Sequence, residues 1–201
     1  MSATARRQQL CDAARDEFVR RGYRNATTLS VATTVGVSDA LVLKYFGSKE
    51  GLFRAAVVDP LLALLEAQMA ENRARAQEDQ PLGVPAAIVG VRTFLLAWAE
   101  LVRQERGALV SLLGDLRDFP DVAEKLGELF REHINHLADT LKPPATLKLY
   151  RQFDPRAATY LAIAGATLAG LVEPDIEGFI DRCVDIIMHG TLSETGRAAL
   201  S

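Results

Sequence analysis

The N-terminal part of the chain gathers cationic side chains and hydroxyl groups of the kind that bind phosphate oxygens. Its first 54 residues carry nine Lys and Arg against five Asp and Glu, a net charge of +4, whereas the whole chain carries −3. The remaining residues therefore carry −7. Basic surfaces attract phosphates and acidic surfaces repel them. This asymmetry indicates a basic region that meets nucleic acid, although ordinary scatter in surface charge is an alternative explanation.

Within this region, residues 27–46 have the spacing of two short helices joined by a tight turn. Thr27 is placed to cap the first helix and Ser38 to cap the second. Gly36 lies between them and easily adopts the positive φ that ends a helix. The inward positions are Val31, Ala32, Val35, Val42 and Phe46. The pattern predicts a helix-turn-helix motif, whose second helix fits the major groove of duplex DNA.

The candidate DNA contacts are of two kinds. Side chains expected to reach the phosphate backbone are Arg6, Arg7, Thr27, Ser38, Lys44, Tyr45 and Lys49. We expect Arg6 and Arg7 on a mobile arm that enters a flanking minor groove or meets phosphates. Asp39, Ala40 and Leu41 begin the second helix and are the expected base readers. Asp39 could accept from a cytosine amine, or merely favour the helix N-terminus through its charge.

Residues 10–57 resemble the N-terminal domain of TetR-family regulators. The shared features are an Ala-Ala pair with a Phe, a Gly-Tyr, a capping Thr with Val-Ala, a Gly-Val-Ser, an aromatic-Phe pair and a Ser-Lys-Glu. In this chain they are Ala13, Ala14, Phe18, Gly22, Tyr23, Thr27, Val31, Ala32, Gly36, Val37, Ser38, Tyr45, Phe46, Ser48, Lys49 and Glu50. The resemblance covers about a quarter of the chain, with many elements in order at matching spacing.

Three positions depart from the family pattern. Thr28, Ala40 and Leu43 stand where the family usually has an apolar residue, a Gly and a Tyr. The family's Tyr commonly contacts a phosphate, a contact that Leu43 cannot make, but Lys44 beside it can supply a charge instead. The more apolar second helix offers methyl contacts to thymine rather than bidentate hydrogen bonds.

The resemblance implies an all-α fold, with a three-helix helix-turn-helix head followed by a larger helical ligand-binding and dimerisation bundle. Apolar residues recur every three or four positions, and Ala and Leu dominate the composition, which also favours helices. We assign the head to residues 1–47 and the body to residues 48–201, with loops around 79–85 and 142–144. About nine helices are expected, at about 5–21, 28–34, 38–45, 49–76, 85–104, 106–115, 121–141, 155–172 and 175–192.

Pro60 interrupts the fourth of these helices, and two interpretations are open. Pro60 could kink one continuous helix, because proline removes a backbone donor. Alternatively, Asp59 could cap a new helix that begins with Pro60. We slightly favour the kink, because the apolar residues on both sides keep one approximate face.

The central helices are expected to enclose a pocket for an apolar or aromatic small molecule. Its candidate lining residues are Phe94, Trp98, Leu101, Phe119, Phe130, His133 and Leu137. For any one of these aromatic residues the alternative is ordinary core packing. Trp98 and His133 are the preferred candidates, because each places a hydrogen-bonding group on an apolar face. His133 and His136, with Glu132 and Asp139, could suggest a metal site, because the two histidines lie on one helical face. The spacing is not that of His-Glu-x-x-His and no Cys ligand is near, so no metal or cofactor is expected.

The last two helices are expected to pair with a second copy of the chain. The candidate interface residues are Ala162, Ala166, Gly170, Phe179, Ile180, Cys183 and Ile187. Small residues on one stripe let helix backbones approach closely, and two helices from each copy form a four-helix bundle. The last two helices do this in TetR-like proteins. The alternative is that both helices stay inside the core of one chain.

The expected function is a ligand-responsive transcriptional regulator, a repressor that binds a pseudo-palindromic operator as a homodimer and is released by a small molecule. The alternative is a DNA-binding dimer of the same fold without an inducer, in an architectural or cell-division role. We expect no enzyme, because no catalytic arrangement of Ser, His and Asp or glycine-rich phosphate loop is found. A cytoplasmic protein without a membrane segment is expected, since the N-terminus is polar and no apolar run is long enough.

Overall fold

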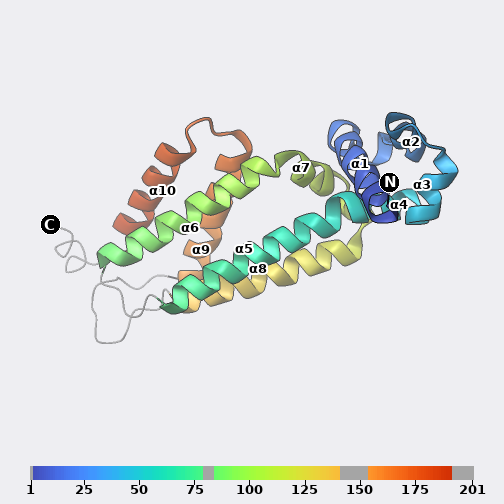
Figure 1. The fold of residues 1–201 in the computed structure, drawn as a ribbon. Helices are drawn as coiled ribbons and strands as arrows, with labels where there is room; N and C mark the ends of the chain where they lie inside the picture. The colour runs from blue at the N-terminus through green and yellow to red at the C-terminus, as the bar shows by residue number, and fades with distance from the viewer. Residues whose placement is uncertain (1, 79–83, 141–153, 192–201) are drawn as a thin grey trace. The chain divides into compact units, whose positions relative to one another are not determined.

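The computed structural model describes residues 2–78, 84–140 and 154–191, and these residues form helices joined by short turns (Figure 1). The expectation of an all-α fold is confirmed. The helices are α1 (Ala3–Asn25), α2 (Thr28–Val35), α3 (Asp39–Phe46), α4 (Lys49–Phe53), η1 (Arg54–Val58), α5 (Asp59–Glu78), α6 (Val84–Gln104), α7 (Arg106–Asp115), η2 (Leu116–Asp118), α8 (Pro120–Thr140), α9 (Pro155–Val172) and α10 (Ile176–Thr191). The loop expected around 142–144 and most of that around 79–85 lie outside the described residues.

The chain folds into two compact units. The first, here called the head unit, comprises Met1–Glu66 and Glu105–Gly127. The second, here called the body unit, comprises Ala67–Gln104 and Glu128–Ser201. The helix-turn-helix region thus shares a unit with α4, η1, the start of α5, α7 and the start of α8.

The core of the head unit is built on one face of α1. Leu10, Ala14 and Phe18 recur every four residues and are fully or almost fully buried. They lie where α1 contacts α2, α4, η1 and α7. The hydroxyl of Ser111 on α7 donates to the carbonyl of Phe18 at 3.2 Å, so this buried polar group is satisfied.

Side-chain caps start the short helices of the head. The backbone N–H of Ser30 donates to Thr27 Oγ1 at 3.1 Å, and that of Leu41 donates to Ser38 Oγ at 3.3 Å. Ser48 caps α4 in the same way, through the N–H of Gly51 at 3.0 Å. Each cap satisfies a backbone donor that the first helical turn leaves free.

The backbone stays helical through Pro60. Asp59 has helical dihedrals (φ −63°, ψ −45°), so it does not cap a separate helix. Its N–H donates to the carbonyl of Arg54, five residues earlier, and Arg54–Val58 form a π-helix. A proline disfavours helical geometry in the residue before it and donates no hydrogen bond, and a π-turn accommodates such a defect. The structure therefore favours the continuous helix over the capped start.

In the body unit, α6 packs against α9 and α10 (Figure 1). Gly170 on α9 lies so close to α6 that a Cβ atom would clash with the carbonyl oxygen of Ala99 and the side chain of Val102. Arg92 on α6 pairs with Glu177 (2.8 Å) and Asp181 (2.5 Å) on α10. Close backbone approach and a surface ion-pair group thus hold the three helices together.

No single helix among the described residues has both the length and the hydropathy of a membrane span. Among the described residues, the pair α2 and α3 reaches the required length and hydropathy when the two helices are counted together, but they are bent by 112° relative to each other.

Candidate nucleic-acid interface

The bend of 112° between α2 and α3 is the geometry of a helix-turn-helix. Gly36 ends α2 in the left-handed region, with φ 73° and ψ 39°. The N–H groups of Gly36 and Val37 donate to carbonyls of the last turn of α2, at 3.2 and 2.9 Å. Val42 on α3 is fully buried and fixes that helix on the head. Both capping residues and the turn glycine therefore have the positions assigned to them, and Val31, Ala32 and Val42 are buried as expected. Val35 and Phe46 are only half-buried.

The outer face of α3 combines apolar and cationic side chains. Ala40, Leu43 and Lys44 are exposed, and Leu41 and Tyr45 are partly exposed. Leu41, Lys44 and Tyr45 line a shallow depression of about 230 Å³. An exposed helix face with methyl groups, one ammonium and one phenol suits contact with thymine methyls and phosphates. Thr27 and Ser38 are also exposed and cap the N-termini of α2 and α3.

Asp39 lies in the first turn of α3 and is partly exposed. Its Oδ1 atom is buried and accepts no hydrogen bond from the described residues. The carboxylate lies at the positive end of the helix dipole, which stabilises it there. Asp39 is thus placed both to stabilise the start of α3 through its charge and to accept from a cytosine amine.

The expectation of a mobile N-terminal arm is wrong. Helix α1 begins at Ala3, and Ser2 caps it by accepting from the N–H of Ala5 at 3.1 Å. The guanidinium of Arg6 donates to Gln9 at 2.9 Å, and that of Arg7 lies 5.1 Å from the centre of the Phe46 ring. Because a capping residue precedes them, both arginines belong to the first turns of a helix rather than to a free arm.

Lys49 is held against the end of α1. Its Nζ donates to the carbonyl of Arg24 at 3.0 Å and lies 4.7 Å from the centre of the Tyr23 ring. The side chain stays partly exposed. In this conformation Lys49 stabilises the head and satisfies a carbonyl at a helix end, as cations near helix C-termini do.

An aromatic cluster and several carboxylates join α1 to the segment from α7 to α8. The rings of Tyr23 and Phe53 lie 4.9 and 5.1 Å from that of Phe119, which is buried. Asp115 accepts from the N–H of Tyr23 at 3.1 Å, and Asp118 pairs with Arg24 at 3.2 Å. Phe119 therefore belongs to the core of the head unit, whereas the other candidate pocket residues belong to the body unit.

In the body unit, four candidate pocket residues form a second aromatic cluster. The ring of Phe94 lies 6.4 Å from Trp98 and 5.4 Å from His133, and Phe130 meets Trp98 edge to face at 5.5 Å. Leu101 is buried in the same unit. The side chain of Leu137 lies outside what the structure describes.

Trp98 and His133 differ in how their polar atoms are used. The indole N–H of Trp98 donates to Thr167 on α9 at 2.9 Å, and the Thr167 hydroxyl donates to the carbonyl of Ile163 at 2.7 Å. His133 is fully buried, and neither ring nitrogen has a hydrogen-bond partner among the described residues. Burial, with the positive charge of Arg73 and the neighbouring His136, lowers the pKa of His133 to about 4.

The candidate interface residues on α9 and α10 divide into interior and accessible groups. Ala166 and Ile180 are fully buried within the chain, and Gly170 packs against α6, so these three belong to the core of the body unit. Ala162, Phe179, Cys183 and Ile187 are partly exposed. The large apolar side chains that the two helices leave exposed are Tyr160, Leu161, Leu168, Val172 and Ile186.

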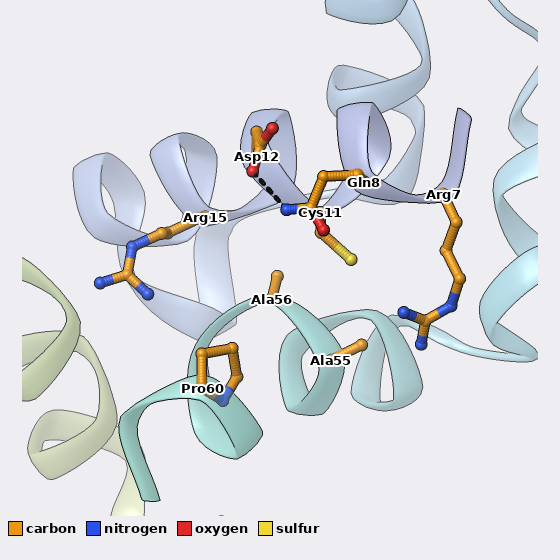
Figure 2. Close-up of a pocket in the computed structure, with 8 residues that line it drawn as sticks. All are labelled: Arg7, Gln8, Cys11, Asp12, Arg15, Ala55, Ala56 and Pro60. Atoms are coloured by element: carbon orange, nitrogen blue, oxygen red, sulfur yellow. Dashed lines mark hydrogen bonds between the residues drawn. The ribbon is translucent and has the colours of Figure 1, made fainter. Parts of the chain in front are cut away.

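A cleft of about 180 Å³ lies in the head unit between α1 and the π-helix (Figure 2). Arg7, Cys11 and Arg15 line it from α1, and Ala55, Ala56 and Pro60 line the opposite side. Its polar groups are largely engaged, since Gln8 donates to Asp12 at 2.8 Å and Arg15 pairs with Glu105. In the described residues, no group of three or more His, Cys, Asp and Glu is placed to hold a metal ion.

Residues 10–56 match the family model of bacterial regulatory proteins of the tetR family. The HTH-type transcriptional regulator BetI of Stenotrophomonas maltophilia is 30% identical over 135 residues, which are 62% of this chain and 68% of that protein. The HTH-type regulatory protein RaaS of Mycobacterium tuberculosis is 32% identical over 157 residues, 77% of this chain and 65% of that protein. The chain belongs to the TetR family.

Solved structures of transcriptional regulators, the TetR-family regulator PfmR among them, share the fold. PfmR from Thermus thermophilus has a TM-score of 0.68 at 20% identity, over 90% of this chain and 97% of that one. A transcriptional regulator from Saccharomonospora viridis in complex with choline has a TM-score of 0.68 at 16% identity, over 95% of this chain and 100% of that one. As a TetR-family member, the chain is a DNA-binding transcriptional regulator and not an enzyme, as expected from its sequence.

Sequence reasoning missed the residues that attach the TetR-type head to the start of α8. Arg54 pairs with Glu50 and Asp121, and its guanidinium lies 5.5 Å from the centre of the Phe119 ring. Thr167, the partner of Trp98, was also missed. No local pattern marks the pairing of Arg54 with Asp121 or of Trp98 with Thr167, because the partners lie 67 and 69 positions apart.

Proposed function

We propose that this chain is a ligand-responsive repressor that binds a pseudo-palindromic operator as a homodimer and is released by a small molecule. The observation that supports it most is the capped helix-turn-helix with the exposed, partly cationic outer face of α3. Membership of a family of transcriptional regulators supports the same function.

In the proposed complex, α3 lies in the major groove. Ala40 and Leu41 contact base edges through methyl groups, and Asp39 accepts from a cytosine amine or stabilises the helix start. Lys44 and Tyr45 contact phosphates, and the N-termini of α2 and α3 add backbone N–H groups near Thr27 and Ser38. Arg6 and Arg7 add positive charge from the first turns of α1, and Lys49 can contact a phosphate only after leaving its present partners.

We further propose that α9 and α10 form the homodimer interface. Leu161, Leu168 and Val172 recur along one side of α9 and are 74%, 56% and 66% exposed. Apolar stripes of this kind are buried when two helices from each copy form a four-helix bundle. Ile186 on α10 extends the apolar surface. Two heads about 34 Å apart then read successive major grooves, so the operator should have twofold symmetry.

The effector is proposed to bind in the body unit at the cluster of Phe94, Trp98, Phe130 and His133. Aromatic walls with few polar groups are typical of sites for small apolar molecules. Release from DNA requires that the effector binds one of two conformations more tightly, with a coupling of about 1–3 kcal/mol. Helices α5 and α8 each run from residues of the head unit into residues of the body unit, so they can carry this coupling.

Selection of bound duplexes from a random pool, followed by titration of three variants, tests the DNA-binding part. Lys44→Ala should weaken binding to all sequences and lower the slope of the salt dependence by about one. Leu41→Ala should change the sequence preference instead. Arg103→Ala, which removes an exposed charge on α6 of the body unit, is the matched control and should change neither. If Lys44→Ala and Leu41→Ala both bind the selected duplex like the unchanged protein, the assignment of α3 is wrong.

A further inference from the structure

His133 carries two buried polar atoms without hydrogen-bond partners in the described part of the chain. Its side chain is 0% exposed, and both Nδ1 and Nε2 are unsatisfied. A buried polar group without a partner costs about 1–3 kcal/mol. A phenylalanine at this position would avoid that cost, because the neighbouring rings are aromatic.

In the cluster of Phe94, Trp98, Phe130 and His133, the imidazole of His133 is the group that can form a hydrogen bond with a ligand. Phe94 lies 5.4 Å from its ring and offers no hydrogen bond. The nearby indole N–H of Trp98 is already used by Thr167. Phe94, whose ring lies beside the imidazole, remains partly exposed, so a small molecule can approach His133 from the side of that ring.

The charge state of His133 restricts what it can bind. Burial and the charge of Arg73 lower its pKa to about 4, so the ring is neutral at physiological pH. A neutral imidazole has one N–H donor and one bare nitrogen acceptor. A hydroxyl can donate to the bare nitrogen or accept from the N–H, so it fits whichever nitrogen faces it. A cation is repelled by Arg73. A carboxylate is attracted by Arg73, but it loses its hydration and meets a neutral imidazole rather than a charged partner at His133.

We infer that His133 is the hydrogen-bonding anchor of the effector site and selects an uncharged molecule that carries a hydroxyl group on an apolar body. The inference rests on the proposed effector site in the body unit. It adds the chemical class of the effector and the residue that recognises its polar group.

Fluorescence of Trp98, the only tryptophan in the chain, reports binding beside His133. The probes are octanol, octanoate and octyltrimethylammonium, which share one alkyl chain and differ in the polar group. Octanol should bind most tightly, and His133→Phe should weaken its binding by about tenfold, the loss of one hydrogen bond. His133→Gln keeps a donor and an acceptor and should retain most of the affinity. Glu128→Gln, on the exposed side of α8 in the body unit, is the control and should leave the order of the probes unchanged.

Thermal unfolding without a probe provides a second measurement. If the imidazole is unsatisfied in the free protein, His133→Phe should unfold at the same or a higher temperature than the unchanged protein. A lower midpoint would mean that the imidazole has a structural partner, and the inference would fail. Tighter binding of octanoate or octyltrimethylammonium, or the absence of any probe response at Trp98, would also overturn it.

Binding of the unchanged protein to its selected duplex, with and without octanol, separates this inference from the proposed function. If no duplex binds with salt-sensitive affinity, the proposed function fails whatever the probes do. If the duplex binds but Trp98 shows no preference for octanol, only the effector class assigned to His133 is wrong.

Discussion

Arg54 and Asp121 form a two-pronged ion pair, with Nη1–Oδ2 and Nη2–Oδ1 distances of 2.8 and 2.9 Å, although 67 positions separate them. Arg54 belongs to the π-helix that follows α4, and Asp121 lies in the first turn of α8. The hydrogen bonds from Arg54 to Asp121 and Glu50 raise the pKa of its guanidinium and keep it charged. The pair therefore fixes the start of α8 on the helix that follows the DNA-binding head.

A double-mutant cycle with Arg54→Met and Asp121→Asn measures this attachment. Each single change should lower the unfolding midpoint by a few degrees, and the double change should lower it by little more, because the first change already breaks the pair. Added salt should reduce the coupling, since both side chains reach solvent. Lys125→Met, which removes the exposed single contact to Glu66, is the control and should have almost no effect. Additive losses would show that the two residues do not act together.

Local features of the fold could be predicted from the sequence because their causes lie within a few residues. Thr27 and Ser38 cap the helices that they were expected to cap, and Gly36 has the expected positive φ. Asp154 caps α9, with Pro155 in the first turn, which is a common start of a helix. Capping and glycine geometry depend on neighbours two or three positions away, so a single sequence contains the required information.

Long-range partners could not be predicted in the same way. The stripe of Ala162, Ala166 and Gly170 indicated a close helix approach, but small residues do not reveal which helix approaches them. In the structure Gly170 meets α6 of the same chain. Phe119 shows the same limit, because an aromatic residue in an apolar pattern can pack in the core of either unit. In the structure it packs against Tyr23 and Phe53 of the head unit.

The turn between α2 and α3 allows a test of backbone conformation without packing effects. A Cβ atom at Gly36 would meet nothing within 4 Å, yet the residue has φ 73°. Gly36→Ala should therefore destabilise the protein by about 1–2 kcal/mol through strain alone, and Gly36→Asn by less. Gly114 on α7 has equally open surroundings without the positive φ, so Gly114→Ala should stabilise by about 0.5–1 kcal/mol. Urea unfolding should show a lower free energy of unfolding for Gly36→Ala and a higher one for Gly114→Ala. Changes of the same sign in both variants would contradict this prediction.

The proposed dimer face predicts how charge on α9 changes assembly. Leu161→Glu and Leu168→Glu place carboxylates on side chains that are exposed in one chain and buried in the proposed dimer. Each should weaken dimerisation by more than about tenfold, measured by sedimentation equilibrium, because an unpaired charge would be buried. Val110→Glu, on an exposed apolar position of α7 in the head unit, should leave the association unchanged. Normal dimers of both α9 variants would exclude this face.

His133 should make the stability of the protein depend on pH in a defined window. Its pKa in the folded chain is about 4, below the ordinary value of 6.5, because burial and the fields of Arg73 and His136 disfavour the charged ring. The unfolded chain therefore binds a proton first as the pH falls, so stability present above pH 6.5 is lost progressively toward pH 4, by about 3 kcal/mol at most. In His133→Phe this part of the pH dependence should vanish, while the response of other groups stays. Urea unfolding at about pH 7.5 and about pH 5 measures the difference, and an equal pH response in both proteins would show that the ring is not buried in its neutral form.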